Sequence, residues 1–314
     1  MSIDHRVSCS TITLRHLPLR EALTAISEAG FTEIDLGALP GVCDHVPYVL
    51  DHAAVSEVSR IVTLSGLSVR SINADVGDLN VPLDDRATVA RAEHVDRLID
   101  LCVAVGSRAL VLPNGRQQHD PVEGLESDLE LVARELAAID AKARGRGIEL
   151  WVEAPHWFRL VYDLDRTAAL LDLLPPTVGV VCDVSHITAS GSTPRAFLAR
   201  FGRRTRHVHI RDAEPGYIHH SVGQGVVDFP DLVSALHDIS YDGVMALELE
   251  TRDTADAERA HEAQRVATYL SGLLSVNADL RQQLDSTAAV ERSAAVTTIV
   301  SEGVAAGSTV SSEL

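Results

Sequence analysis

The sequence predicts an α/β fold with one barrel domain, an eight-stranded parallel (β/α)8 or TIM barrel over residues 1–274, followed by a C-terminal tail at 275–314. Short β-branched or apolar runs alternate along the chain with longer amphipathic runs, which is the pattern of repeated βα units around a parallel sheet. Each kind of run occurs eight times. The chain has 314 residues, 46% of them hydrophobic, which is enough for one barrel with a large core.

The strands and helices follow one another in strict alternation. We expect strands near residues 6–10, 33–36, 69–74, 108–112, 148–153, 178–183, 207–210 and 244–248. Amphipathic patterns predict helices near residues 18–29, 52–65, 86–105, 121–145, 165–174, 193–201, 229–238 and 254–274. Pro18 and Pro121 stand where the first turn of a helix tolerates proline, and Gly30, Gly66 and Gly243 mark the ends of elements.

The tail differs in composition from the rest of the chain. It is rich in Ala, Ser, Thr and Val and has few large side chains with which to build a core. We therefore expect a partly helical beginning and then a flexible or loosely docked end.

Composition limits the classes of protein to which the chain can belong. No apolar run approaches the 18 residues of a transmembrane helix and the first residues do not resemble a secretory signal, so we expect a soluble, cytoplasmic protein without a membrane partner. The net charge of −18 argues against a nucleic-acid substrate, because such binding depends on Lys and Arg. The four cysteines form no CxxC pair and are expected to be reduced and mostly buried.

Side chains that can bind a metal recur at the ends of the last four predicted strands. The strand-end segments are WVEAPH, VVCDVSH, RHVHIRD and MALELE, which present Glu153, Asp183, His209 and Glu248. In a barrel, the C-terminal ends of the strands converge on the face where the active site is built. Three carboxylates and an imidazole suit one divalent metal, with Mn²⁺ expected first, Co²⁺ or Zn²⁺ next, and Mg²⁺ as a further candidate.

Each of these residue types also occurs for ordinary structural reasons. A lone histidine such as His207 is more typical of a packed core residue, and His209 lies nearer the end of the same strand. Asp212 alone is as typical of a solvated loop acid as of a site residue, and Glu250 falls beyond Glu248 in a loop. The metal site is favoured because four candidate ligands coincide at consecutive strand ends.

The sequence resembles the sugar isomerase/epimerase superfamily of xylose-isomerase-like barrels over nearly all of residues 5–272. The resemblance rests on Glu153, the DVSH segment that begins at Asp183, HVHIRD around His209, the GQG within 222–226, and YDG before Glu248. It implies that Glu153, Asp183, His209 and Glu248 bind the metal and that His186 contacts the substrate.

At two places the sequence differs from members of this superfamily, and these differences limit which activity the resemblance implies. Endonuclease IV, a member of this superfamily, needs three zinc ions and extra histidines, whereas strand ends here offer Asn73, Pro113 and Asn114, and Tyr217 replaces an expected aspartate. Ketose 3-epimerases resemble this chain but place an arginine where Pro215 stands, with only Arg211 nearby. Abasic-site cleavage and the usual ketohexose substrate are therefore disfavoured.

Further residues at the predicted mouth of the barrel are candidates for substrate binding. These are His156, Arg211 and His219, with His220 beside them. A loop histidine is as often merely solvated. The segment LPGVCDHVPY is unusually long and apolar for a βα loop, and it is expected to form either a substrate lid or a packed surface loop.

The predicted chemistry is proton transfer next to a carbonyl group of a sugar or keto-polyol. A metal that chelates a carbonyl and a neighbouring hydroxyl stabilises an enediolate, while Glu153 and Glu248 remove and return the proton and His186 binds a substrate oxygen. Isomerisation or epimerisation ranks first. A lyase that expels a β-substituent is the second candidate, and a non-catalytic sugar-binding barrel is the third. Barrels of this type often pair, so a homodimer is an assembly to test.

Overall fold

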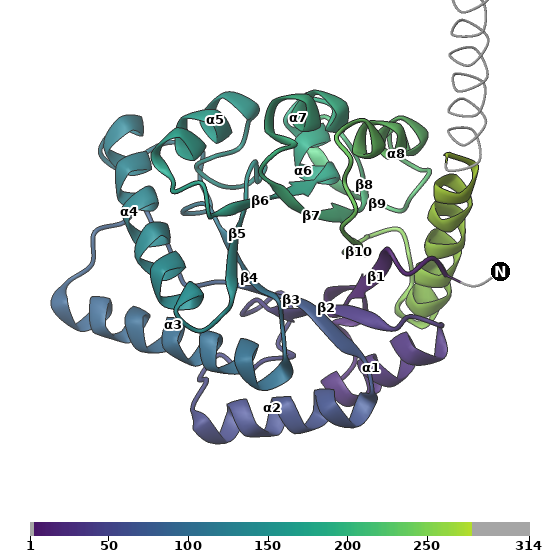
Figure 1. Ribbon diagram of the computed structural model, residues 1–314, viewed down its shortest axis with the longest axis horizontal. Helices are drawn as coiled ribbons and strands as arrows, with labels where there is room; N and C mark the ends of the chain where they lie inside the picture. The colour runs from purple at the N-terminus through teal and green to yellow at the C-terminus, as the bar shows by residue number, and fades with distance from the viewer. Residues whose placement is uncertain (1–2, 278–314) are drawn as a thin grey trace, which may run out of the picture. The chain divides into compact units, whose positions relative to one another are not determined.

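The computed structural model describes residues 3–277 and is a closed eight-stranded parallel barrel surrounded by helices (Figure 1). The prediction of a TIM barrel is confirmed. The barrel strands are β1 (Val7–Ser10), β2 (Glu33–Ala38), β3 (Ser68–Ala74), β4 (Ala109–Pro113), β5 (Glu149–Glu153), β6 (Gly179–Asp183), β7 (Thr205–Ile210) and β10 (Met245–Leu247). Each strand pairs in parallel with the next along the chain, and β1 closes the ring against β10.

The helices lie outside the sheet, as the βα pattern requires. They are α1 (Leu19–Glu28), α2 (His52–Ser65), α3 (Asp85–Val105), α4 (Leu125–Arg144), α5 (Leu164–Leu173), α7 (Pro194–Phe201), α8 (Phe229–Asp238) and a last helix that begins at residue 259. Side chains of Asp51, Asp84, Asp163 and Asp228 accept hydrogen bonds from backbone N–H groups in the first turns of α2, α3, α5 and α8. Two predicted helix starts were wrong: α4 begins at Leu125, so that Pro121 precedes the helix, and the last helix begins at residue 259 instead of near 254.

Three types of element were not expected from the sequence. The short helix α6 (Val184–Ala189) follows β6 directly, and the antiparallel hairpin of β8 (Asp212–Glu214) and β9 (Tyr217–His220) follows β7. The 3-10 turns η1 (Thr11–Leu14) and η2 (Asp256–Glu258) complete the set. All six residues of α6 are buried, so the segment lacks the amphipathic period by which helices are recognised.

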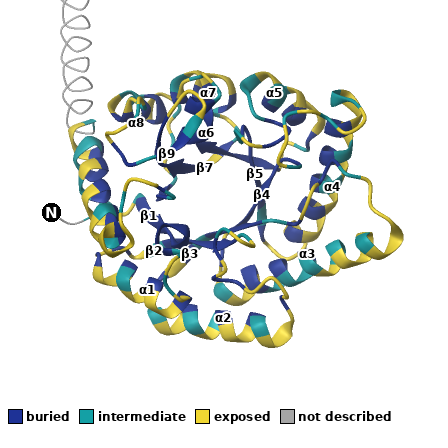
Figure 2. Ribbon diagram, turned by 180° about the vertical axis from the view of Figure 1, so that it is seen from behind, coloured by how far each residue is buried: buried dark blue, intermediate teal, exposed yellow. Residues whose placement is uncertain are grey.

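The barrel has two unlike faces. Residues of alternating position, such as Ile34, Leu36 and Val208, form an apolar layer against the helices. The inner face carries buried polar groups from several strands, among them Asp35, Ser71, Asn73, His207 and His209. A small apolar cluster of Ala109, Val111, Trp151 and Val181 accompanies them. Figure 2 shows the buried ring of strands and the exposed outer surfaces of the helices.

Several other expectations can be compared with the described residues. The four cysteines are free and buried, as predicted. Within 3–277, no helix is both long and apolar enough to cross a membrane. The chain divides into a compact unit, Met1–Ser271, and a second unit, Gly272–Leu314. The predicted tail lies almost wholly at 278–314, outside the described residues, so the boundary at 274 and the character of the tail stay predictions.

Candidate metal centre

The four side chains predicted as metal ligands lie together inside one end of the barrel. Glu153, Asp183, His209 and Glu248 are all buried, and each offers a ligand atom within 4.8 Å of the others. The Nδ1 atom of His209 lies 3.1 Å from Glu153 Oε1, 3.5 Å from Glu248 Oε2 and 3.8 Å from Asp183 Oδ2. The structure therefore brings side chains from the ends of four different strands into one cluster, as the sequence pattern predicted.

The strand register explains why these side chains meet. Glu153 and Asp183 are the last residues of β5 and β6, and Asp183 pairs with His209 across to β7. Glu248 comes directly after β10, where its backbone N–H donates to the carbonyl oxygen of Ile210. All four positions are at the C-terminal ends of adjacent strands, where barrel enzymes place their active sites.

The two carboxylate oxygens of Asp183 have different surroundings, and these explain the spacing of the DVSH segment. Its Oδ1 atom accepts from the backbone N–H groups of Ser185 and His186 and from the Ser185 hydroxyl, so it caps α6. Its Oδ2 atom is buried and has no hydrogen-bond partner. One helical turn brings His186 Nε2 to 4.0 Å from that atom. Asp183 thus presents a single unsatisfied oxygen to the cluster.

Burial and crowding of charge alter the acid–base behaviour of the cluster. Burial, together with the neighbouring carboxylate of Glu153 and against the opposing charge of His209, raises the pKa of Glu248 to about 8. Burial opposes the charged form of His209, but the carboxylates of Glu248, Asp35 and Glu153 raise the pKa of His209 well above its usual value. The pKa of Asp183 is lowered because His186, Arg211 and His209 outweigh its burial.

The donor set fits a divalent cation. Three carboxylates and one imidazole converge in a buried volume, and one carboxylate oxygen there has no other partner. Buried carboxylates crowded together are costly unless they are paired or bind metal. Glu153, Asp183, His209 and Glu248 would hold the ion, and the absence of thiolates from the set suits Mn²⁺, Zn²⁺, Co²⁺ or Mg²⁺.

Two supporting residues come from the opposite side of the ring and were not assigned a role from the sequence. Asp35 on β2 is fully buried, and its Oδ2 atom lies 3.2 Å from His209 Nε2. Asn73 on β3 donates from Nδ2 to Glu248 Oε1 at 3.0 Å. The available signal for Asp35 was an acid between two apolar residues, Ile34 and Leu36, in the middle of a strand.

The predicted core role of His207 is confirmed. Both its ring nitrogens are buried without a hydrogen-bond partner, and the ring stacks on Trp151 with centroids 5.3 Å apart. Burial, aided by the nearby charge of His209, lowers the pKa of His207 to about 3. This histidine is therefore neutral and belongs to the barrel interior.

Two stacked histidines border the cluster on its outer side. The rings of His156 and His186 lie 3.9 Å apart, and His156 Nε2 is 3.8 Å from Glu153 Oε2. Burial lowers the pKa of His156 well below its usual value and also lowers that of His186. The Nδ1 atom of His186 accepts from the Trp157 backbone N–H at 3.0 Å, so its proton is on Nε2, the nitrogen that faces Asp183.

The other predicted substrate-binding residues also border this space. Burial and charged neighbours lower the pKa of His219, whose Nδ1 lies 2.9 Å from the carbonyl oxygen of Glu250, so the donor there is Nδ1. Arg211 is almost completely buried and is 3.3 Å from Glu250 and 3.8 Å from Asp183. His220 instead lies 3.4 Å from Glu214 in the hairpin. Roles in substrate binding for His156, Arg211 and His219 stay predictions.

A cavity of about 260 Å³ opens from the cluster, just below the size of roughly 300–1,000 Å³ typical of ligand sites. Its walls include Glu153, Glu248, His156, His186, Arg211 and His219. The apolar loop after β2 supplies Leu39, Pro40 and Val42. The loop is anchored where His45 Nε2 approaches the Leu17 carbonyl oxygen at 2.9 Å, so in this structure it is a packed wall of the cavity.

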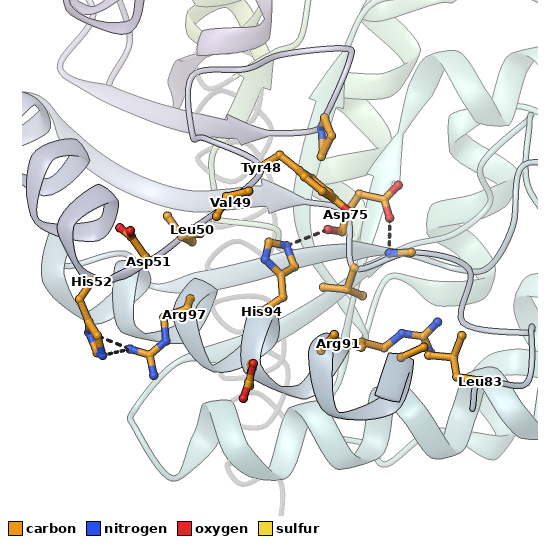
Figure 3. Close-up of a pocket in the computed structure, with 16 residues that line it drawn as sticks. Tyr48, Val49, Leu50, Asp51, His52, Asp75, Leu83, Arg91, His94 and Arg97 are labelled. Atoms are coloured by element: carbon orange, nitrogen blue, oxygen red, sulfur yellow. Dashed lines mark hydrogen bonds between the residues drawn. The ribbon is translucent and has the colours of Figure 1, made fainter. Parts of the chain in front are cut away.

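A larger cleft of about 860 Å³ lies beside α2 and α3 (Figure 3). It shares Pro40 and Asp75 with the cavity but contains none of the four clustered side chains. Two of its polar side chains are already bonded: His94 Nε2 lies 3.3 Å from the Asp75 carbonyl oxygen, and Arg97 binds Asp100. The candidate metal ligands Glu153 and Glu248 line the smaller cavity and not this cleft.

The GQG segment is explained by Asp212. This residue is buried, and its carboxylate accepts from the backbone N–H groups of Ala213, Gly223, Gly225 and Val227 at 2.8–3.1 Å. A side chain at position 225 would collide with the Asp212 carboxylate and with the backbone of Ala213. Of the two interpretations of Asp212, the solvated loop acid is wrong, because the residue organises the loop after the hairpin.

Comparison with known proteins agrees with this architecture. Residues 23–270 match the family described as xylose isomerase-like TIM barrel. Inosose dehydratase from Lacticaseibacillus casei is 24% identical over 211 residues, covering 56% of this chain and 68% of that protein. The rhizopine catabolism protein MocC from Rhizobium meliloti is 23% identical over 271 residues, covering 78% of this chain and 77% of that protein.

Solved structures share the fold at low sequence identity. An L-ribulose 3-epimerase has a TM-score of 0.72 at 18% identity, with 90% of this chain and 98% of that chain covered. The IOLI protein with a zinc atom has a TM-score of 0.71 at 17% identity, with 85% and 98% covered. The match to the family extends over most of the sequence, and the chain therefore belongs to the xylose isomerase-like TIM barrel family.

Proposed function

We propose that the protein is a divalent-metal-dependent sugar isomerase or epimerase. The observation that carries the proposal is the buried cluster of Glu153, Asp183, His209 and Glu248 next to a polar cavity. When bound there, a divalent cation supplies Lewis-acid stabilisation of the negative charge of an enediolate. A barrel that only bound sugar would have no use for three crowded, buried carboxylates, whose burial opposes folding.

The two glutamates are the acid–base pair of the proposed reaction. They come from β5 and from the end of β10, so a substrate carbon in the cavity can have one carboxylate on each side. Glu153 removes the proton next to the carbonyl group, and Glu248 returns a proton. Asn73 holds one oxygen of Glu248 and leaves Oε2 on the side of His209.

The cavity favours a neutral sugar or keto-polyol as substrate. Its two buried arginines are already paired, Arg211 with Glu250 at 3.3 Å and Arg159 with Asp75 at 2.6 Å. Neutral imidazoles of His156 and His186 offer hydrogen bonds to hydroxyl groups, and His186 presents its Nε2 proton to a substrate oxygen. The third arginine of the wall, Arg252, is exposed and joins no ion pair among residues 3–277, so a phosphate or carboxylate group on the substrate would have only this side chain as an uncommitted cation.

A lyase is the second candidate, and the stacked pair His156 and His186 favours it. An enediolate can expel a group at the β-position if a further acid protonates the leaving group. His156 Nε2 lies 3.8 Å from Glu153 Oε2, so a proton could pass between them at that end of the cavity through one bridging water or a substrate hydroxyl. The similarity to inosose dehydratase supports the same alternative.

Incubation with neutral keto sugars and inososes in D₂O tests the proposal. With Mn²⁺ or Zn²⁺ added separately, an isomerase or epimerase gives a deuterated substrate or isomer of otherwise unchanged mass, whereas a lyase gives a product that has lost water or an aglycone. Glu153→Gln and Glu248→Gln should abolish deuterium uptake. Glu149→Gln, at the other end of β5, is the matched control and should retain it. Full exchange by the Glu153→Gln protein would refute the assignment.

A further inference from the structure

The His209 ring has a different environment at each of its two nitrogens. Nδ1 faces the carboxylates of Glu153, Asp183 and Glu248 at 3.1–3.8 Å. Nε2 points the other way, toward Asp35 Oδ2 at 3.2 Å. Both His209 and Asp35 are completely buried. The contact with Asp35 is the one that restrains the ring from the interior of the barrel.

Asp35 is itself held in place from the neighbouring strand. The Ser71 hydroxyl on β3 donates to Asp35 Oδ1 at 2.7 Å, and Asp35 pairs with Ser71 in the strand register. Asp35 Oδ2 has no hydrogen-bond partner within the described chain, and neither has His209 Nε2, which lies 3.2 Å away. A buried carboxylate oxygen without a donor is costly. The Nε2–H group of His209 is the donor that lies within reach.

The remaining nearby ring does not compete for that oxygen. His207 is two residues before His209, and its ring is nearly perpendicular to that of His209 with centroids 4.9 Å apart. The same ring stacks on Trp151, with ring centroids 5.3 Å apart. No ion pair of 4.0 Å or less joins His207 to Asp35 among residues 3–277, whereas His209 makes one at 3.2 Å.

We propose that Asp35 is a positioning residue for the metal centre. It accepts the Nε2 proton of His209, which fixes the tautomer and the orientation of the ring and leaves the Nδ1 lone pair for the cation. This inference rests on the metal site of the proposed function. Carboxylate partners of metal-binding histidines act in this way in other proteins, and their loss typically weakens metal binding by 10–100-fold. Asp35 touches neither the cation nor the substrate.

Metal affinity measured without turnover tests the role. Zinc is titrated into the full chain in competition with a chromophoric chelator. Asp35→Leu should raise the Kd for zinc by about 10–100-fold, and Asp35→Asn, which keeps an acceptor oxygen but not the charge, should raise it less. Asp140→Asn is the matched control: Asp140 is also a buried acid that accepts from a hydroxyl, that of Thr177 at 2.6 Å, but it lies on α4 outside the cavity wall.

A readout of the tautomer separates positioning from general stabilisation. In the zinc-loaded wild-type protein, long-range ¹H–¹⁵N spectra should show the His209 proton on Nε2, and this measurement does not require any variant to fold. A proton on Nδ1, or a Kd of Asp35→Leu within threefold of wild type, would overturn the inference. Wild-type protein that binds no zinc would overturn it together with the proposed function. Zinc bound in this manner without deuterium exchange into any substrate would overturn the proposed function alone.

Discussion

The metal-free protein should lose stability as the pH rises toward 8, and substitution of Glu248 by Gln should remove most of this loss. Glu248 is buried beside Glu153, and its pKa is raised from 4.5 to about 8. The folded protein therefore keeps the proton of this carboxyl at pH values where the unfolded chain has lost it. The amide introduced by Glu248→Gln preserves the shape of the protonated acid and can still accept from the Asn73 amide.

The sign and size of the effect follow from linkage. A carboxyl whose pKa is raised by folding stabilises the protein fully below its unfolded value of 4.5, and this contribution is lost as pH rises through about 8. The difference between the two values corresponds to on the order of 5 kcal/mol in the free energy of unfolding. In the presence of a chelator, wild type should lose this amount between pH 5 and 8.5 relative to Glu248→Gln.

Urea denaturation at a series of pH values, with chelator and then with saturating Mn²⁺ or Zn²⁺, measures the effect. Glu250→Gln is the control of opposite sign: despite its burial, Arg211 and Arg15 lower the pKa of Glu250, so its contribution is lost as pH falls. With saturating metal, wild type should have the higher free energy of unfolding of the two proteins, because Glu248→Gln lacks one of the metal ligands. Parallel pH profiles of wild type and Glu248→Gln in chelator would show that Glu248 is not protonated in the folded state.

Three further predictions concern the metal and the loop after the hairpin. Removal of the cation, when present at 100 times its Kd, should lower the free energy of unfolding by about 2.7 kcal/mol and Tm by about 5 °C, measured by calorimetry; an unchanged Tm would argue against the site. Metal binding should release protons below pH 8, because Glu248 and His209 must give up protons to bind the ion. Calorimetric titrations in buffers of different ionisation enthalpy measure the number of protons released. A value of zero would contradict the pKa shifts of these two residues. Asp212→Ala should lower the free energy of unfolding by about 3 kcal/mol, because four backbone N–H groups lose an acceptor. Asp163→Ala, which removes an ordinary helix cap, should lower it by about 1 kcal/mol. Equal urea midpoints for the two variants would refute this account of the GQG segment.

The barrel and the cluster of candidate metal ligands were predictable because both depend on local patterns. A strand buried on both faces reads as a short apolar run, and a ligand at its end interrupts the run with one polar residue, as Glu153 and Asp183 do. The order of strands around a parallel barrel follows the order in the sequence, so side chains at consecutive strand ends must be neighbours. The polar residues at the ends of β5, β6, β7 and β10 were therefore sufficient to predict the cluster.

The supporting residues could not be found in the same way. Asp35 belongs to the centre because it reaches His209 across the interior of the barrel, and this contact depends on the tilt and curvature of the whole sheet. The helix α6 and the β8–β9 hairpin were missed for a related reason. Their residues are buried on most sides, so tertiary contacts, such as the cap that Asp183 places on α6, override the periodic signal.

The polar lining of the barrel has a consequence for how the protein can adapt to heat. Most barrels fill their interior with branched apolar side chains, whereas here the polar Asp35, Asn73, His207 and His209 share that space with a small apolar cluster. Cohesion must come chiefly from the layer between strands and helices, where Ile34 and Val208 lie. Variants with higher melting temperatures should therefore accumulate in that outer layer and at helix termini, because tightening the centre would sacrifice activity.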